Sequence, residues 1–376
     1  MLTQVDKVID STRNTLISDD KITSKKDIFD KINQNNIIGS SRVDKMVDAV
    51  SADLLGLGPL QFLAEIKGVT DIVVNGPNNV FIDRGHGMER AQIEPEKLDT
   101  SEKLREFAFK LAVLSGSRLD DSAPIVDAQL PMGYRLHAVI EPLCENGALI
   151  SIRIPSQNIL SFDQFVADKT INQQWAENIK QFIKERKNIV ITGATGSGKT
   201  TLLAALISLI NQSERIICIE ESKEIPNFIH PHIISLIAKK PNIEGLGEIT
   251  LQQLVKASLR MRPDRLLLGE ARGPEISDLL IALNTGHKGG IATLHSNDAN
   301  SVPARLEALG ALAGLKPQAL AAQAISAIDI ILHIDKISCG KFDSSKNLVK
   351  RKLTQIAKLT LNTDYRLGVE ILQSEK

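Results

Sequence analysis

The spacing of hydrophobic positions changes near residue 155. Beyond that point, short apolar runs typical of buried strands alternate with stretches in which apolar residues recur at helical period. The predicted strands are 189–192, 215–219 and 265–268, and the predicted helices are 175–186, 200–210, 251–260 and 311–328. Strands that alternate with helices predict an α/β fold with a mostly parallel, doubly wound sheet.

Short β-like segments with one helical stretch between them characterise the residues before 155. The strands are predicted at 70–74, 80–83, 135–140 and 148–154, and the helix at 101–115. This mixture indicates a small α+β domain over 53–155. A polar break follows the last strand and predicts a linker over 156–165, so the second domain covers 166–376. Residues 1–52 have charged and apolar positions at helical spacing and predict a helical segment.

Composition and charge limit the classes of partner and compartment. The chain has 376 residues, a formal net charge of zero and 3% aromatic residues. The neutral balance and the shortage of stacking side chains argue against direct nucleic-acid binding. Its 3 cysteines lack metal-ligand spacing, and no apolar run approaches the ~20 residues that span a bilayer. We therefore expect a cytoplasmic protein without a signal peptide or a transmembrane segment of its own.

A glycine-rich turn follows the strand 189–192 directly. It fits the pattern G-x-x-x-x-G-K-[ST] of a phosphate-binding loop and opens a helical stretch, so it predicts binding of a nucleoside triphosphate such as ATP. Glycines let backbone N–H groups crowd around a phosphate, and the helix behind them favours the anion. Lys199 can reach the β- and γ-phosphates, and the Thr200 hydroxyl can hold Mg²⁺. The predicted nucleotide-binding residues are Gly193, Thr195, Gly196, Ser197, Gly198, Lys199, Thr200 and Thr201.

Glu270 ends the strand 265–268 and is the candidate for the carboxylate that orients water toward the γ-phosphate. The carboxyl end of a buried strand is where ligands bind in such sheets. The segment 265–270 is the candidate for the Walker B motif, and Gly269 stands where an aspartate is usual in that motif. Binding of Mg²⁺ would therefore depend on Thr200, water and a second acidic strand end.

That second acidic end follows the strand 215–219. Glu220 and Glu221 come directly after its apolar residues, and Glu224 lies close behind. Neighbouring acids at a strand terminus can orient water or hold a metal ion through solvent. The alternative for each of these glutamates, as for Glu270, is a solvated surface charge.

Histidines and arginines supply further candidates. His295 ends a short apolar strand and can sense or polarise the γ-phosphate, and a purely structural histidine is the equal alternative. His230 and His232 lack a third metal ligand, so we interpret them as loop residues. Arginine binds phosphate in a bidentate manner. The arginine candidates, each also compatible with a surface salt bridge, are Arg135, Arg153, Arg260 and Arg262.

Four segments together resemble the secretion ATPases of type II and type IV systems. They are GATGSGKT, IEESKEI, LRMRPDRLLLGEARGPE and ALNTGHKGGIATLHSND, spread over roughly residues 180–310. The first domain contributes DLLGLGPLQFLAEIKGVTDIVVNGPNNVFIDRG, GSRLDDSAPIVDAQLPMGYRLHAV and ISIRIPS. Within the family, these segments resemble the CpaF/TadA motors of tight-adherence (Flp-type) pili.

The resemblance implies an architecture and a function. The architecture is a PAS-like domain preceded by helices, a short linker and a RecA-like P-loop ATPase domain, assembled as a homo-hexamer. The function is Mg²⁺-dependent ATP hydrolysis that drives assembly or retraction of a pilus, through a platform protein of the inner membrane with which the motor associates peripherally.

The resemblance also assigns roles to the candidate residues. It makes Glu270 the catalytic Walker B glutamate and His295 the histidine of the His box. It makes Glu220, Glu221 and Glu224 the acids of the Asp box. The arginines become phosphate contacts from the first domain (Arg135, Arg153) and charge stabilisers at a subunit boundary (Arg260, Arg262, Arg272).

Departures and alternatives remain at this point. Glu221 stands where aspartate is common in the family, and the tail after Ile334 lacks the usual compact charged hairpin. The same enzyme also fits a type IV secretion motor that moves effector proteins or DNA. A type II motor is disfavoured because the four-cysteine metal module is missing. A nucleic-acid translocase or a P-loop kinase would be a different class.

Overall fold

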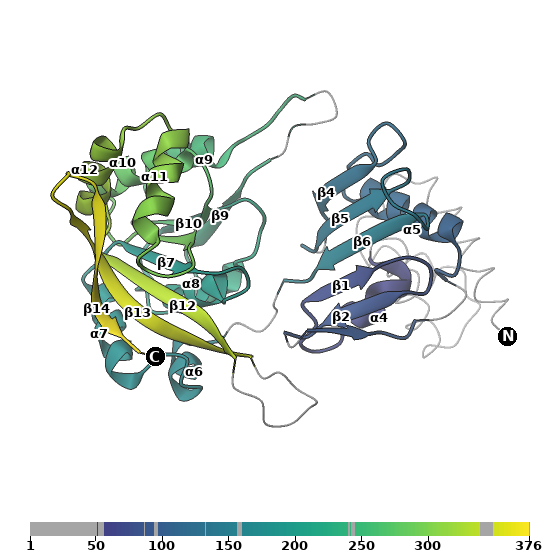
Figure 1. The fold of residues 1–376 in the computed structure, drawn as a ribbon, viewed down its shortest axis with the longest axis horizontal. Coiled ribbons are helices and arrows are strands. Elements are labelled where there is room, and N and C mark those ends of the chain that lie inside the picture. The colour runs from purple at the N-terminus through teal and green to yellow at the C-terminus, as the bar shows by residue number, and fades with distance from the viewer. Residues whose placement is uncertain are drawn as a thin grey trace. The chain divides into compact units, whose positions relative to one another are not determined.

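The computed structural model describes residue 51 and residues 56–375, without 86, 94–96, 132, 156–159, 240, 242–244 and 339–348. The chain divides into two compact units, Met1–Pro155 and Ser156–Lys376, each with its own hydrophobic core (Figure 1). The predicted helical segment 1–52 lies, apart from Ser51, outside the described residues. Within the described part of the chain, no helix is long and apolar enough to span a bilayer.

The first unit is built on a six-stranded antiparallel sheet in the order β3-β2-β1-β6-β5-β4. Its strands are β1 (Asp71–Val74), β2 (Val80–Asp83), β3 (Met88–Arg90), β4 (Ile125–Gln129), β5 (Arg135–Ile140) and β6 (Ala148–Arg153). Its described helices are η1 (Gly58–Leu60), α4 (Gln61–Ala64) and α5 (Ser101–Leu114). The Thr100 hydroxyl accepts a hydrogen bond from Lys103 N at the start of α5. The apolar face of α5, which includes Leu104 and Leu111, packs on β5 and β6.

The second unit is built on an eight-stranded sheet in the order β14-β13-β12-β7-β11-β10-β8-β9. The strands from β12 to β9 in this order are parallel, and β12, β13 and β14 pair antiparallel. The strands are β7 (Ile189–Gly193), β8 (Ile216–Glu220), β9 (Ile233–Ile237), β10 (Arg265–Ala271), β11 (Ile291–His295), β12 (Ile330–Ser338), β13 (Val349–Leu361) and β14 (Leu367–Ser374). The prediction of a mostly parallel sheet is confirmed.

Helices cover both faces of this sheet, because its strands are apolar on both sides. In β10, Leu266 and Leu268 belong to one core cluster, whereas Leu267 belongs to the other. Figure 1 shows α9 to α12 gathered on one side of the sheet. The elements on the two sides are α6 (Phe162–Ala167), α7 (Gln173–Lys184), α8 (Lys199–Ile207), η2 (Asn227–Ile229), α9 (Leu251–Ser258), η3 (Leu259–Met261), α10 (Glu275–Asn284), α11 (Val302–Leu312) and α12 (Pro317–Ala327). The α/β, doubly wound fold class is confirmed.

The predicted single helix 311–328 is wrong. It consists of the end of α11, a turn, and the whole of α12. Gly314 has a φ of +75°, a left-handed conformation that ends a helix, and Pro317 occupies the first turn of the next one. An added Cβ on Gly310 would lie 2.9 Å from the Leu320 side chain, so the two helices pack closely. The run of Ala and Leu concealed this break.

The predicted linker 156–165 is too long at its carboxyl end. Helix α6 begins at Phe162, and Ser161 and Gln164 form a capping box at its start. Phe162 and Phe165 are buried in the core of the second unit. The polar residues that indicated a linker therefore include the cap of a packed helix.

The described residues of the tail after Ile334 form an antiparallel ladder of β12 and β13, and the predicted absence of a compact charged hairpin concerns a connection, 339–348, that lies outside the described residues. Strands β12 and β13 pair Asp335 with Lys352 and Lys336 with Arg351. Strand β14 then pairs with β13 at the edge of the sheet.

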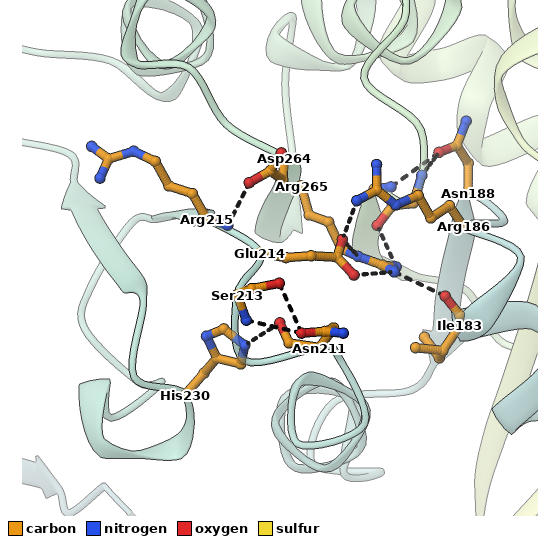
Figure 2. Close-up of polar contacts among 12 residues, drawn as sticks. Ile183, Arg186, Asn188, Asn211, Ser213, Glu214, Arg215, His230, Asp264 and Arg265 are labelled. Carbon is orange, nitrogen blue, oxygen red and sulfur yellow. Dashed lines mark hydrogen bonds and ion pairs between the residues drawn. The ribbon is translucent and has the colours of Figure 1, made fainter.

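A buried polar network joins the amino ends of the central strands (Figure 2). Arg265 opens β10 with a side chain that is 1% exposed. Its Nε donates to Glu214 Oε2 at 2.7 Å, and one terminal nitrogen donates to Ile183 O at 2.9 Å. Asn188 Oδ1 accepts the backbone N–H groups of Gly289 and Gly290 in the same region. These contacts hold together the amino ends of the central strands.

Candidate functional site

The phosphate-binding loop connects the end of β7 to the start of α8. Gly193 packs so closely that an added Cβ would collide with Ile334 O and Ser197 Oγ. Gly198 has a φ of +100° at the cap of α8, a conformation that side chains rarely adopt. Only glycine fits at these two positions, and the backbone is left open to an approaching phosphate.

Lys199 lies inside this loop. Its Nζ donates to the backbone oxygens of Gly193 and Ala194, both at 3.0 Å. Burial lowers the pKa of Lys199, and the nearby Glu270 carboxylate opposes that shift. The Ser197 hydroxyl is buried and has no hydrogen-bond partner among the described residues. The loop therefore holds a cation and an unsatisfied hydroxyl next to exposed backbone.

The other predicted loop residues are more accessible. Thr195 and Gly196 are exposed at the tip of the loop. Thr200 and Thr201 are half-buried in the first turn of α8. A hydroxyl at this place suits a divalent cation bound beside a phosphate. In the described part of the chain, no three His, Cys, Asp or Glu side chains cluster as a metal site.

Sheet order brings the predicted acids and His295 to the same edge as the loop. Strand β11 lies between β7 and β10, and its His295 is paired with Gly193. Strand β8 follows β10, with Ile219 paired to Leu268. Parallel strands end at one edge, so Glu220, Glu270 and His295 line up beside the loop.

Glu270 is held by an arginine two residues further along the chain. Arg272 donates to Glu270 Oε2 at 2.7 Å and also binds Glu221. Ion pairing with Glu270 raises the pKa of Arg272. The Glu270 side chain is 27% exposed, so it remains accessible to water. Arg272 thus orients the proposed catalytic carboxylate within its own chain.

Glu275 fixes the turn after β10, a role that the sequence did not suggest. Its buried carboxylate accepts the backbone N–H groups of Arg272 at 2.6 Å and Gly273 at 2.7 Å. The feature of the sequence that could have indicated this role is an acid in the first turn of a helix, here α10.

Glu220 is buried, so the alternative of a solvated surface charge does not apply to this residue. Its Oε1 accepts backbone N–H groups from Glu224 and Ile225 at 3.0 Å each, and its Oε2 has no partner among the described residues. Burial raises the pKa of Glu220 to about 7. An added Cβ on Gly269 would lie 3.2 Å from Glu220 Cγ. Glu220 therefore packs where a side chain at position 269 would otherwise begin.

His295 is half-buried at the last position of β11. Its ring has no hydrogen bond or ion pair with any described residue. The buried Thr293 hydroxyl donates to Gly269 O and ties β11 to β10 two residues earlier. The ring is thus free to meet a ligand at the carboxyl edge.

The remaining histidines and arginines lie elsewhere. His230 lies in a loop, and its Nε2 contacts Asn211 O at 3.0 Å (Figure 2). His232, two residues further on, contacts Arg215. Arg260 and Arg262 are exposed before β10 begins, at the opposite edge of the sheet from the loop. The structure does not bring these two arginines to the site of their own chain.

Arg135 and Arg153 belong to the first unit. They are cross-strand partners in β5 and β6. Arg135 makes a bidentate pair with Asp127 at 3.1 and 3.2 Å, and Arg153 donates to Asp71 at 3.1 Å. These pairs offset the repulsion between the two guanidinium groups.

Residues 53–362 match the sequence model of the type II/IV secretion system protein family. The chain belongs to this family.

Individual relatives and a solved structure extend this result. A Mycobacterium tuberculosis protein assigned to conjugal transfer is 39% identical over 86% of this chain and 90% of its own length. The type IV secretion system protein VirB11 of Bartonella quintana is 30% identical over 78% of this chain and 92% of its own length. The crystal structure of the pilus retraction motor PilT with bound ADP aligns with a TM-score of 0.52, over 77% of this chain and 80% of that chain, at 20% identity. This last similarity bears on the fold alone.

Proposed function

We propose that the protein is an ATP-hydrolysing motor of a type II/IV secretion system. The main observation in its favour is that the phosphate-binding loop, Glu270 and His295 lie at the same edge of the sheet. They follow or end three neighbouring parallel strands, β7, β10 and β11. Lys199 would exchange its two backbone acceptors for phosphate oxygens of ATP. The buried, unsatisfied Ser197 hydroxyl fits a phosphate or a metal-bound water.

Each side chain has a distinct task in this proposal. Glu270, oriented by Arg272, positions the attacking water against the γ-phosphate. His295 polarises or senses that phosphate from the adjacent strand. The Thr200 hydroxyl would hold Mg²⁺, which supplies neutralisation of the developing charge. Glu220 and Glu221 complete the acidic edge, the first as a buried support and the second through Arg272.

Replacing Glu270 by Gln tests this assignment. We expect phosphate release to fall by about 100-fold or more while ATP binding persists, since a positioned water is lost but the phosphate contacts remain. The matched control is Glu185→Gln, an exposed acid at the amino edge of the sheet. A Glu270→Gln variant that turns over at the wild-type rate removes Glu270 from the water-positioning role.

Arg135 and Arg153 are proposed to contact the triphosphate bound by this chain or by a neighbouring copy. Their place as cross-strand partners on adjacent strands supports this role. We expect charge reversal at Arg135 to lower turnover and nucleotide affinity together. Lys97, another cation of the first unit, serves as the matched control for the lost charge.

Two machines are candidates for the system that this motor drives. The first-unit segments favour assembly or retraction of a tight-adherence pilus, and the names of the relatives favour type IV secretion. In either case a homo-hexamer on the cytoplasmic side of the inner membrane would act on a membrane platform protein. Native mass measured with and without Mg·ATP tests the hexamer, and an active monomer would overturn it. Deleting the gene and scoring pili against substrate transfer separates the two machines.

A further inference from the structure

Two cations of the β12–β13 ladder lie against the phosphate-binding loop. An added Cβ on Gly196 would lie 2.9 Å from Lys336 Nζ. On Gly198 it would lie 3.0 Å from Arg351 Cδ and 3.5 Å from Arg351 Nε. Lys336 and Arg351 are cross-strand partners, so their side chains share one face of the ladder. Both are exposed, and neither belongs to the edge described above.

The charges of these two side chains are not offset within the described residues. Neither makes an ion pair or a hydrogen bond with a described residue. Adjacent charges are already engaged: Asp335 binds His333 and Thr354, and Lys352 pairs with Glu375. Like charges directly opposite each other destabilise a ladder. An anion between them would remove that repulsion.

A hydrogen-bond chain sets the position of the ladder relative to the loop. Thr192 Oγ1, at the end of β7, lies 2.8 Å from Nδ1 of the buried His333. His333 Nε2 lies 3.1 Å from Asp335 Oδ1, and the Thr354 hydroxyl donates to Asp335 Oδ2 at 2.8 Å. The chain thus links the residue before Gly193 to the residue before Lys336. The fold therefore sets the backbone positions from which the two cations extend.

Sheet order indicates which part of a nucleotide these cations meet. Strand β7 lies between β12 on one side and β11, followed by β10, on the other. Glu270, on β10, must lie near the γ-phosphate to orient water against it. The chain of phosphates therefore runs from the β10 side toward β12. Lys336 and Arg351 lie at the end where the α-phosphate and the nucleoside leave the loop.

We propose that Lys336 and Arg351 form a cationic clamp on the α- and β-phosphates, the part that ATP and ADP share. This inference rests on the proposed nucleotide-binding function of the loop. A clamp on shared groups contributes equally to ground state and transition state. It therefore sets affinity for both nucleotides and leaves the chemical step unchanged.

The test measures binding of Mg·ADP and Mg·ATP to the full chain carrying Lys336→Ala, Arg351→Ala or both. A charge-assisted contact predicts about 5- to 10-fold weaker binding for each single variant, by the same factor for ADP and ATP. The KM for ATP should rise accordingly, with kcat within about twofold of wild type. Arg351→Lys should recover part of the affinity. Lys350→Ala, the next residue on the other face of β13, is the matched control.

The outcomes separate this inference from the proposed function. Single and double variants that bind Mg·ADP as tightly as wild type overturn the clamp, and so does a loss confined to ATP. A wild-type protein that binds neither nucleotide overturns the proposed function instead. Thermal unfolding of each variant confirms that its fold is retained, which is expected because both side chains are exposed.

Discussion

Glu220 combines a buried carboxyl with a position at the open edge of the sheet. Its side chain is 2% exposed and has one oxygen without a partner among the described residues. Burial raises the pKa of Glu220 from 4.5 to about 7. The folded protein therefore retains a proton on this group over a pH range in which the unfolded chain has lost it.

This difference predicts a pH dependence of stability. Below pH 4.5 both states are protonated, and as pH rises from 4.5 to about 7 the unfolded state alone releases its proton. The free energy of unfolding should therefore decrease across this window, by up to about 3 kcal/mol, and level off above it. Denaturant unfolding of the nucleotide-free protein at a series of pH values measures the slope. The Glu220→Gln variant should lose most of this dependence of the free energy of unfolding on pH. An unchanged slope in the variant would assign the pH dependence to other groups.

Replacing Gly269 by Asp should destabilise the protein instead of improving catalysis. The added Cβ would lie 3.2 Å from Glu220 Cγ and 3.4 Å from Ile219 O. Crowding of this kind costs about 1–3 kcal/mol, and a second buried acid beside Glu220 adds to it. Chemical denaturation and phosphate release check both effects. Higher turnover at unchanged stability would contradict this account of Gly269.

At the residue level, a position was predictable where a local pattern encodes it. The loop from Gly193 to Thr200 has a contiguous pattern, so its position was predictable. The approach of Lys336 to Gly196 depends on how β12 pairs with its neighbours, which no local pattern encodes. Glu220 was found as an acid at a strand end, but its burial follows from packing against β10. The roles assigned to these candidates remain predictions.

At the scale of elements, the Arg265–Glu214 pair joins the start of β10 to the turn before β8 (Figure 2). Arg186 also contacts Glu214, at 3.0 Å. A buried ion pair gains little over an apolar pair, but its removal on one side leaves an uncompensated charge. The network therefore acts mainly to specify how the strands begin.

Glu214→Ala should lower the free energy of unfolding by about 3–5 kcal/mol, because Arg265 stays buried without its carboxylate. The control is Glu307→Ala, which removes an ion pair with the half-exposed Arg366 and should lower the free energy of unfolding much less. Denaturant titration of both variants provides the comparison. Equal losses would mean that burial does not distinguish the two pairs.

Elements of strong periodicity were predicted well, and breaks within them were not. The strand 80–83 and the strand 135–140 have the predicted bounds. Helices α11 and α12 were merged, because an Ala- and Leu-rich run keeps its period across Gly314. Pairing of β13 with β12 and β14 joins residues far apart in the chain, so sequence period alone could not predict it.

At the scale of the whole molecule, the two units have cores without a shared residue. Their existence was predictable from the change in hydrophobic spacing near 155. The strand order of each sheet was not, because it depends on crossover connections.

Separate cores predict separable unfolding. Ile152→Ala removes buried volume from the first unit, and Leu280→Ala does so in the second. Each should lower the stability of its own unit by about 2–5 kcal/mol and leave the other nearly unchanged. Calorimetry should resolve two transitions, with each variant moving a different one. A single transition shifted by both variants would show that the units unfold together.

The polar network at the amino edge of the sheet also limits which substitutions its positions accept. Gly289 has a φ of +81°, and an added Cβ there would lie 2.7 Å from a terminal nitrogen of Arg265. Arg265 in turn requires the Glu214 carboxylate. Glu214 and Arg265 therefore depend on each other, and Gly289 is constrained both by Arg265 and by its own left-handed φ. Among relatives, loss of the arginine should free the glutamate to vary, so positions 214 and 265 should change together, whereas position 289 should stay glycine because its φ is left-handed.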